Sequence, residues 1–146
     1  MFIELIELLY LFASIWMTAV IWFVQLVHYP TFKFVPIEKM ISFSEFHQHS
    51  ISFIVMPAMM LELLSCSYLV FHSDFSLPIS LQLLLIILIW IATFTLSVPC
   101  HQKLITKPDY KSVTKLINTN WIRTILWTTK LFLFLLFFLN NFFDFA

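Results

Sequence analysis

Four of the five histidines lie at the ends of apolar stretches, where they could share one site. His28 follows the first stretch and His101 follows the third. His47 and His49 precede the second. Neutral imidazole binds Fe, Cu and Zn, so this set predicts one transition-metal ion. Its expected ligands are His28, His47, His101 and, as a fourth candidate, His49.

Two other roles compete with a metal ion at these histidines. A haem b could be held by His28 and His101. This is less favoured, because both residues lie at helix ends and not deep in the bundle. Alternatively, each His meets headgroups and water independently, because an imidazole at the membrane surface keeps its polar edge wet. If a metal binds, Gln25, Glu45 and Asn120 are candidate partners for the free ring nitrogens.

Polar residues also recur at helical spacing inside the apolar stretches, and they predict a polar pocket. Polar side chains in lipid must face protein or water, and a membrane helix does not need them for its own stability. The expected pocket residues are Gln25, Ser97, Asn120, Trp127 and Lys130. Glu62 and Arg123 are the predicted catalytic residues, as an acid or base and as a group that stabilises an anion.

Glu62 and Lys130 are expected to interact inside the bundle. At about 1.5 Å per residue, Glu62 lies roughly 18 Å and Lys130 roughly 14 Å from the inner membrane surface. A lone charge at that depth costs roughly 3 kcal/mol, and pairing reduces this cost. In the alternative interpretation, Lys130 extends toward the inner surface and Glu62 is protonated.

The composition identifies the kind of chain that must position these residues. The residues are 61% hydrophobic and 11% charged, whereas a soluble domain has about 25% charged residues. The formal net charge is zero, so no basic surface attracts nucleic acid. The chain has no Gly, which excludes the P-loop, the Rossmann fingerprint and the nucleophile elbow. An integral membrane protein remains.

Four runs are long enough to cross a bilayer, which takes about 20 apolar residues. The expected spans are residues 8–29, 51–71, 77–98 and 122–139. None of them alternates with a period of two, which excludes a β-barrel. The sequence therefore predicts an all-α, four-helix membrane bundle that forms a single transmembrane domain over residues 1–146.

The basic residues predict the direction of the spans. All eight lie in segments 30–50 and 99–121 or in the first part of the fourth span, and the opposite side carries only acidic residues. By the positive-inside rule, two long loops lie in the cytoplasm and both termini lie outside. The expected location is the bacterial inner membrane, with the four histidines at its cytoplasmic face.

The two inner segments carry further patterns. Lysines recur every four residues from Lys103 to Lys115, which predicts an interfacial amphipathic helix over residues 109–119 or, equally, a plain topology signal. His28-Tyr29-Pro30 ends the first span, and Pro99-Cys100-His101 ends the third. This similarity of the two halves is what an internal duplication would produce.

Three blocks carry a resemblance to known proteins. They are WFVQLVHYP (residues 22–30), PAMMLEL (57–63) and NWIRT (120–124). With these blocks the chain resembles a family of small bacterial four-helix membrane proteins of unknown function, over nearly its whole length. Its size and four-span layout also look loosely like those of anthrone-oxygenase-like membrane proteins, and that likeness favours oxygen chemistry.

Three functions remain open at this point. The first is a metal-dependent oxidoreductase or oxygenase whose lipid-like or quinone-like substrate enters from the bilayer. The alternative is a non-enzymatic membrane subunit or assembly factor, in which the polar stripes only hold the helices together. A small transporter would need an oligomer. The expected partners are the lipid bilayer, a lipid-like substrate, and a second copy or another subunit.

Overall fold

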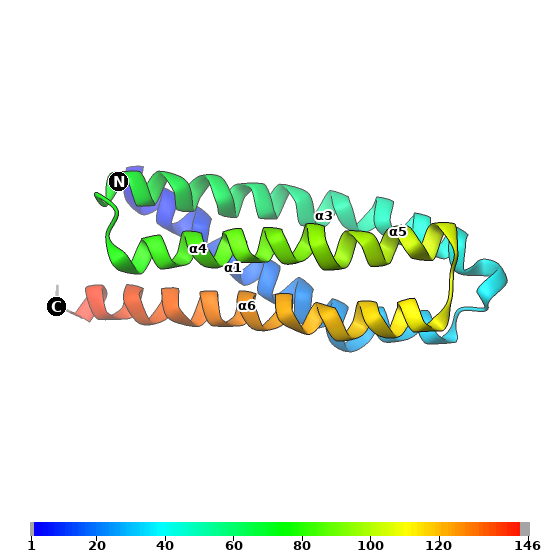
Figure 1. Ribbon diagram of the computed structural model, residues 1–146. Helices are drawn as coiled ribbons and strands as arrows, with labels where there is room; N and C mark the ends of the chain where they lie inside the picture. Colours follow the sequence, from blue (N-terminus) through cyan, green and yellow to red (C-terminus); the bar gives the residue numbers. More distant parts are fainter. Residues whose placement is uncertain (1, 144–146) are drawn as a thin grey trace.

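The computed structural model describes the backbone of residues 2–143 and the side chains of residues 2–137. Every element in this part is helical, which confirms the all-α class, and four long rods result (Figure 1). The first rod joins α1 (Phe2–Phe23), η1 (Val24–His28), α2 (Tyr29–Thr31) and η2 (Phe32–Phe34). The second is α3 (Ile37–His72). The third joins α4 (Leu77–Ala92), η3 (Thr93–Ser97) and α5 (Val98–Thr106). The fourth is α6 (Tyr110–Phe143).

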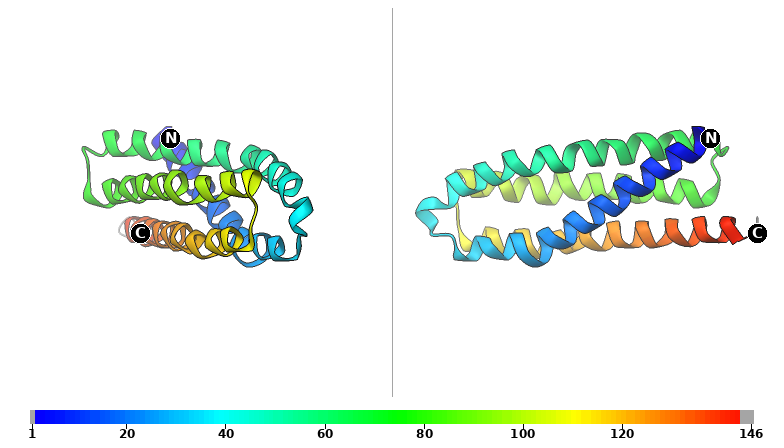
Figure 2. Two further views of the ribbon diagram at one scale, coloured as in Figure 1. Left: turned by 45° about the vertical axis from the view of Figure 1, so that its right-hand side comes forward. Right: turned by 180° about the vertical axis from the view of Figure 1, so that it is seen from behind.

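Three rods run side by side, and the first rod crosses behind them (Figure 1). Seen from behind, α1 begins beside α3 and reaches α6 at the other end of the bundle (Figure 2). The described chain begins and ends at the same end of the bundle, where the turn between α3 and α4 also lies. The connections that precede α3 and α6 lie at the opposite end. This arrangement is the one expected for four crossings.

Three of the rods are long and apolar enough to cross a membrane: Phe2–Phe34, Ile37–His72 and Leu77–Thr106. They indicate a membrane protein, and the many large apolar side chains on the outside of the bundle fit contact with lipid. The described part of α6 is not among the three. It contains the fourth expected span, 122–139, except that the side chains of residues 138 and 139 lie outside the described part.

The prediction of two long inner loops is wrong, because helices occupy most of segments 30–50 and 99–121. The rods are joined by residues 35–36 and 107–109 alone. Pro36, with ψ 143°, ends the 3-10 turn of η2 and precedes α3. Asp109 caps α6: its Oδ1 accepts a hydrogen bond from the Ser112 N–H at 2.5 Å, and its Oδ2 lies 3.0 Å from Lys103 Nζ. The predicted helix over residues 109–119 is thus the first part of α6.

Asp109 also titrates differently from an ordinary aspartate. The hydrogen bonds from Ser112 and Lys103 stabilise its charged form, and they lower its pKa from 3.8 to about 2. This carboxylate therefore stays charged over almost the whole pH range, and it holds the start of α6.

Both halves of the chain contain a five-residue π-helical turn just before a proline. The N–H of Tyr29 donates to the carbonyl of Val24, and the N–H of Val98 donates to that of Thr93. Pro30 and Pro99 follow directly. Proline lacks an N–H and its ring displaces the carbonyl four residues earlier, so a wider turn relieves the clash. The same sequence of features in both halves is what a duplication predicts.

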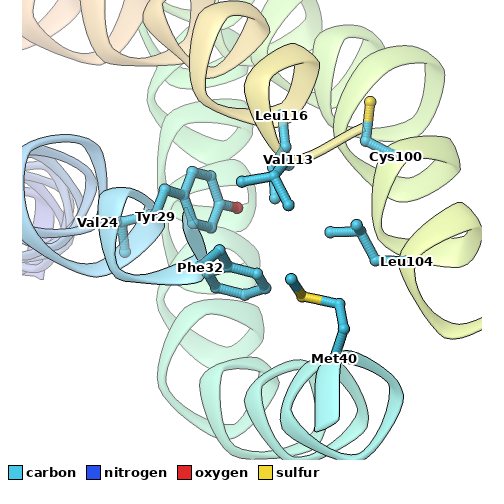
Figure 3. Packing of buried hydrophobic residues seen from close by; sticks show 8 residues of the cluster. All are labelled: Val24, Tyr29, Phe32, Met40, Cys100, Leu104, Val113 and Leu116. Carbon is cyan, nitrogen blue, oxygen red and sulfur yellow. The ribbon is translucent and has the colours of Figure 1, made fainter. Parts of the chain in front are cut away.

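At the end of the bundle that carries the connections 35–36 and 107–109, called the loop end below, all four rods contribute to an apolar cluster (Figure 3). Phe32 and Met40 are fully buried there, together with Leu104 and Val113. Tyr29 belongs to the same cluster. The packing fixes the rod ends against each other, and the polar site lies directly next to it.

Candidate functional site

The structure brings His28, His47 and His101 together from three rods. His28 Nε2 lies 2.7 Å from His47 Nδ1, and the two rings stack with centroids 4.4 Å apart. The ring of His101 lies 5.3 Å from that of His47, centroid to centroid. Since η1, α3 and α5 meet at this level of the bundle, the three imidazoles form one continuous group.

Tyr29 extends this group, and the sequence interpretation missed it. Its hydroxyl lies 2.9 Å from His101 Nε2, and its ring is buried. The signal was its place directly after His28 in the block WFVQLVHYP. Two ring nitrogens of the group, His47 Nε2 and His101 Nδ1, are buried and make no hydrogen bond to the described residues.

Two of the predicted metal ligands, His28 and His47, contact each other directly. His28 and His47 direct a nitrogen each at the other rather than at a common centre. Among the described residues, no group of three or more His, Cys, Asp or Glu side chains is placed to hold a metal. His49 lies on the exposed side of α3, where its ring packs against Phe53. Metal binding by His28, His47 and His101 therefore stays a prediction.

A hydrogen-bonded chain of polar side chains joins the first rod to α6. Asn120 Nδ2 donates to Gln25 Oε1 at 2.8 Å, and Gln25 Nε2 donates to the carbonyl of Ile117 at 3.2 Å. Arg123 Nη1 donates to Asn120 Oδ1 at 3.2 Å and to Ser97 Oγ at 3.0 Å. The expected pocket residues Gln25, Ser97 and Asn120 thus meet at Arg123.

Arg123 carries a buried charge without an acidic partner. Its side chain is 7% exposed, and its Nε makes no hydrogen bond to the described residues. In the part of the chain whose side chains are described, ion pairs join Lys103 to Asp109 and Lys130 to Glu62, and neither involves Arg123. The guanidinium lies over the Trp127 ring, 5.2 Å from its centroid. Neutral dipoles and a π face surround this cation.

A cavity of about 170 Å³ lies against Arg123. Its polar wall consists of Tyr29, Ser52, Thr93, Ser97, His101 and Arg123. Its apolar wall comes mainly from α1 and α3: Met17, Val20, Ile21, Val24, Ile51, Val55, Met56 and Met59. Met56 is 44% exposed and Val98 is 47% exposed, so the cavity opens on the outside of the bundle between α3 and α5.

Glu62 and Lys130 form the predicted pair, which confirms their interaction. Lys130 Nζ lies 2.5 Å from Glu62 Oε1 and donates to Ser14 Oγ at 2.7 Å. Trp127 Nε1 donates to Glu62 Oε2 at 3.1 Å. Tyr10 supplies a further contact, since its hydroxyl lies 3.4 Å from Lys130 Nζ. The pair is almost completely buried and each charge has several partners.

The structure therefore divides the expected pocket into two groups. Lys130 and the predicted catalytic residue Glu62 belong to the packed cluster near the middle of the bundle, and neither of them lines the cavity. The other predicted catalytic residue, Arg123, lies at the cavity with Ser97 and His101. Trp127 connects the groups, because its N–H bonds Glu62 and its ring lies under Arg123.

Fold and site together indicate a helical membrane protein with a lateral cavity that has one polar wall. No family model, curated protein or solved structure matches the chain. The resemblance to small bacterial membrane proteins rests on the three sequence blocks alone, and each block contributes to a buried polar group: Gln25 and His28, then Glu62, then Asn120 and Arg123.

Proposed function

We propose that the protein crosses the bacterial inner membrane four times with both termini outside, and that its cavity takes up a lipid-like or quinone-like molecule directly from the bilayer. The observation that carries this proposal is the cavity itself, which is apolar along α1 and α3, polar at Arg123 and His101, and open between α3 and α5. Ligand sites combine a mostly apolar wall with a few convergent polar groups in this way.

Oxidation or reduction of the bound molecule is the proposed reaction. Tyr29, His101 and Arg123 offer hydrogen bonds to an oxygen of the substrate, and His47 and His28 continue the chain toward the loop end. Such a chain can deliver or remove a proton. A transition metal at the histidines would supply the electron chemistry.

The binding step is tested with the protein in lipid nanodiscs and a short-chain quinone as the probe. Val55→Trp places a large ring in the cavity wall, and Phe53→Trp places the same ring on the lipid-facing side, where Phe53 is 70% exposed. We expect Val55→Trp to weaken binding at least about tenfold. Phe53→Trp should bind like the wild type. Equal binding by both variants would place the ligand elsewhere.

A metal-dependent reaction is favoured by one observation: two buried ring nitrogens, His47 Nε2 and His101 Nδ1, make no hydrogen bond to the described residues. Elemental analysis and an optical spectrum of protein purified without chelators test it. We expect Fe, Cu or Zn bound in the wild type and lost in His47→Phe, with His49→Phe as the matched control. A metal content that both variants retain would contradict a site at His47.

The non-enzymatic alternative is supported by the Glu62–Lys130 cluster, which holds three rods together without needing a ligand. It predicts that cavity variants leave function in the cell unchanged, whereas variants of Glu62 abolish it. The oxidoreductase proposal predicts that Val55→Trp is as damaging as the loss of Glu62.

The proposed orientation has its own test, since both native cysteines are buried and leave the background low. In intact cells, Asp74→Cys at the turn after α3 should react with an impermeant maleimide. Lys111→Cys near the start of α6 should react only after the membrane is opened. The opposite labelling pattern would move the cavity's polar end to the outer face.

A further inference from the structure

The charge of Arg123 defines what can fill the cavity. A charge buried away from water is unfavourable unless a partner compensates it. Most buried charges avoid this cost through an ion pair, as Lys130 does with Glu62. The groups that face Arg123 are all uncharged or aromatic: Tyr29, Ser97, His101, Asn120 and Trp127. The described part of the chain thus holds a cation at the cavity wall without an acidic side chain to pair with it.

The hydrogen bonds of the guanidinium leave its Nε unused. Nη1 donates to Ser97 and Asn120, and the Tyr29 hydroxyl is a further hydrogen-bonding neighbour of the group. Nε is buried and makes no hydrogen bond to the described residues. Nε and Nη2 lie side by side on one edge of the planar group, and their two N–H bonds match the two oxygens of a carboxylate.

We propose that Arg123 binds the carboxylate of a single-chain amphiphile, such as a fatty acid, whose tail leaves the cavity between α3 and α5. This inference rests on the lateral cavity of the proposed function and adds the chemical class of its ligand. Tyr29 and His101 lie at the same polar wall. They position the head, and Met56 and Val98 border the exit where the tail meets lipid.

The size of the cavity favours a carboxylate over a phospholipid head. A phosphodiester carries substituents on two of its oxygens, so its head needs space on both sides of the phosphate. The cavity holds about 170 Å³ and opens between α3 and α5. A carboxylate is planar, ends the molecule, and needs a single exit for its chain.

The experiment compares two ligands that differ only in charge, dodecanoate and dodecanamide, binding to the full-length protein in nanodiscs of uncharged lipid. We expect dodecanoate to bind at least about tenfold more tightly than dodecanamide, the range of a charge-assisted hydrogen bond. In Arg123→Met this preference should disappear. In Lys107→Met, which removes an exposed cation, it should persist.

Each outcome has a separate meaning. If neither ligand binds the wild type, the cavity is not a ligand site and the proposed function fails. If both bind equally, the cavity takes apolar molecules and the carboxylate proposal alone fails. If a lysophospholipid competes better than dodecanoate, the anion is a phosphate and the proposal is overturned.

The folding of Arg123→Met is checked by the same design. Arg123→Met strands no charge, so the ligand-free variant should still fold and melt in one cooperative transition, although Ser97 and Asn120 lose a hydrogen bond. Dodecanoate should raise the melting temperature of the wild type and leave that of the variant unchanged. Arg123→Lys keeps the charge but not the two parallel N–H groups, and it should retain part of the preference. Full retention by Arg123→Met would overturn the proposal.

Discussion

Two buried cations on α6, Lys130 and Arg123, have their charges compensated by different kinds of partner. Lys130 is fully buried, and it is paired with Glu62 and bonded to Ser14. Arg123 is 7% exposed, has no acidic partner in the described part of the chain, and borders a cavity. The first charge is satisfied by the protein itself. The second has only neutral partners, Ser97, Asn120 and Trp127 among them, and in our proposal a bound carboxylate supplies its counter-charge.

The largest expected effect is on stability, from breaking the Glu62–Lys130 pair on one side only. Lys130→Met leaves a buried carboxylate and Glu62→Gln leaves a buried ammonium, so each single variant should lose about 3–5 kcal/mol of unfolding free energy. The double variant should lose less than either single one, because no charge is stranded. Unfolding by SDS in mixed micelles measures this. Additive losses would show that the pair contributes no coupling.

The matched substitution at Arg123 tests the same property, the unfolding free energy. Without ligand, Arg123→Met should lower the unfolding free energy by at most about 1–3 kcal/mol, less than Lys130→Met does, since it removes hydrogen bonds to Ser97 and Asn120 but strands no charge. The same SDS titration gives the value. A loss as large as that of Lys130→Met would mean that the protein itself satisfies Arg123 as fully as it satisfies Lys130.

A smaller effect is expected at the histidine group. His28→Phe removes the 2.7 Å contact and leaves His47 Nδ1 without its partner, so we expect a loss of about 1–3 kcal/mol. His49→Phe, on the exposed side of α3, serves as the control and should lie within about 0.5 kcal/mol of the wild type. Similar losses of unfolding free energy in the two variants would show that the histidine group does not help to join the rods.

The smallest effect lies outside the membrane-spanning part, at the start of α6. Asp109 has its pKa lowered from 3.8 to about 2, so its charged form stabilises the folded state above pH 3.8. That contribution is lost as the pH falls from 3.8 toward 2. Asp109→Asn should lack this part of the acid dependence. Melting temperatures of both proteins between pH 2 and pH 6 provide the measurement, and parallel curves would contradict the assignment.

The helix class and the main pair of charges could be predicted from the sequence, because both depend on local pattern. A run of about 20 apolar residues forms a helix in lipid whatever its neighbours. The depths of Glu62 and Lys130 follow from the rise per residue, so the contact between them is predictable from the sequence. The helix over residues 109–119 was predicted, but its continuity with the fourth span in α6 was not, and neither was the start of α3 at Ile37. Both depend on the short connections at residues 35–36 and 107–109, where Pro36 and the Asp109 cap end one helix and begin the next.

The sequence by itself determined that the chain is helical and apolar, and that His28, His47 and His101 lie at one level of the bundle. Tertiary structure alone decided the rest. It placed Tyr29 on His101, turned Arg123 toward a cavity and Lys130 toward Glu62, and put His49 outside. The physical reason is that the rotation of each rod about its axis, and the crossing of α1 behind the others, are set by packing between rods, which no single rod's sequence contains.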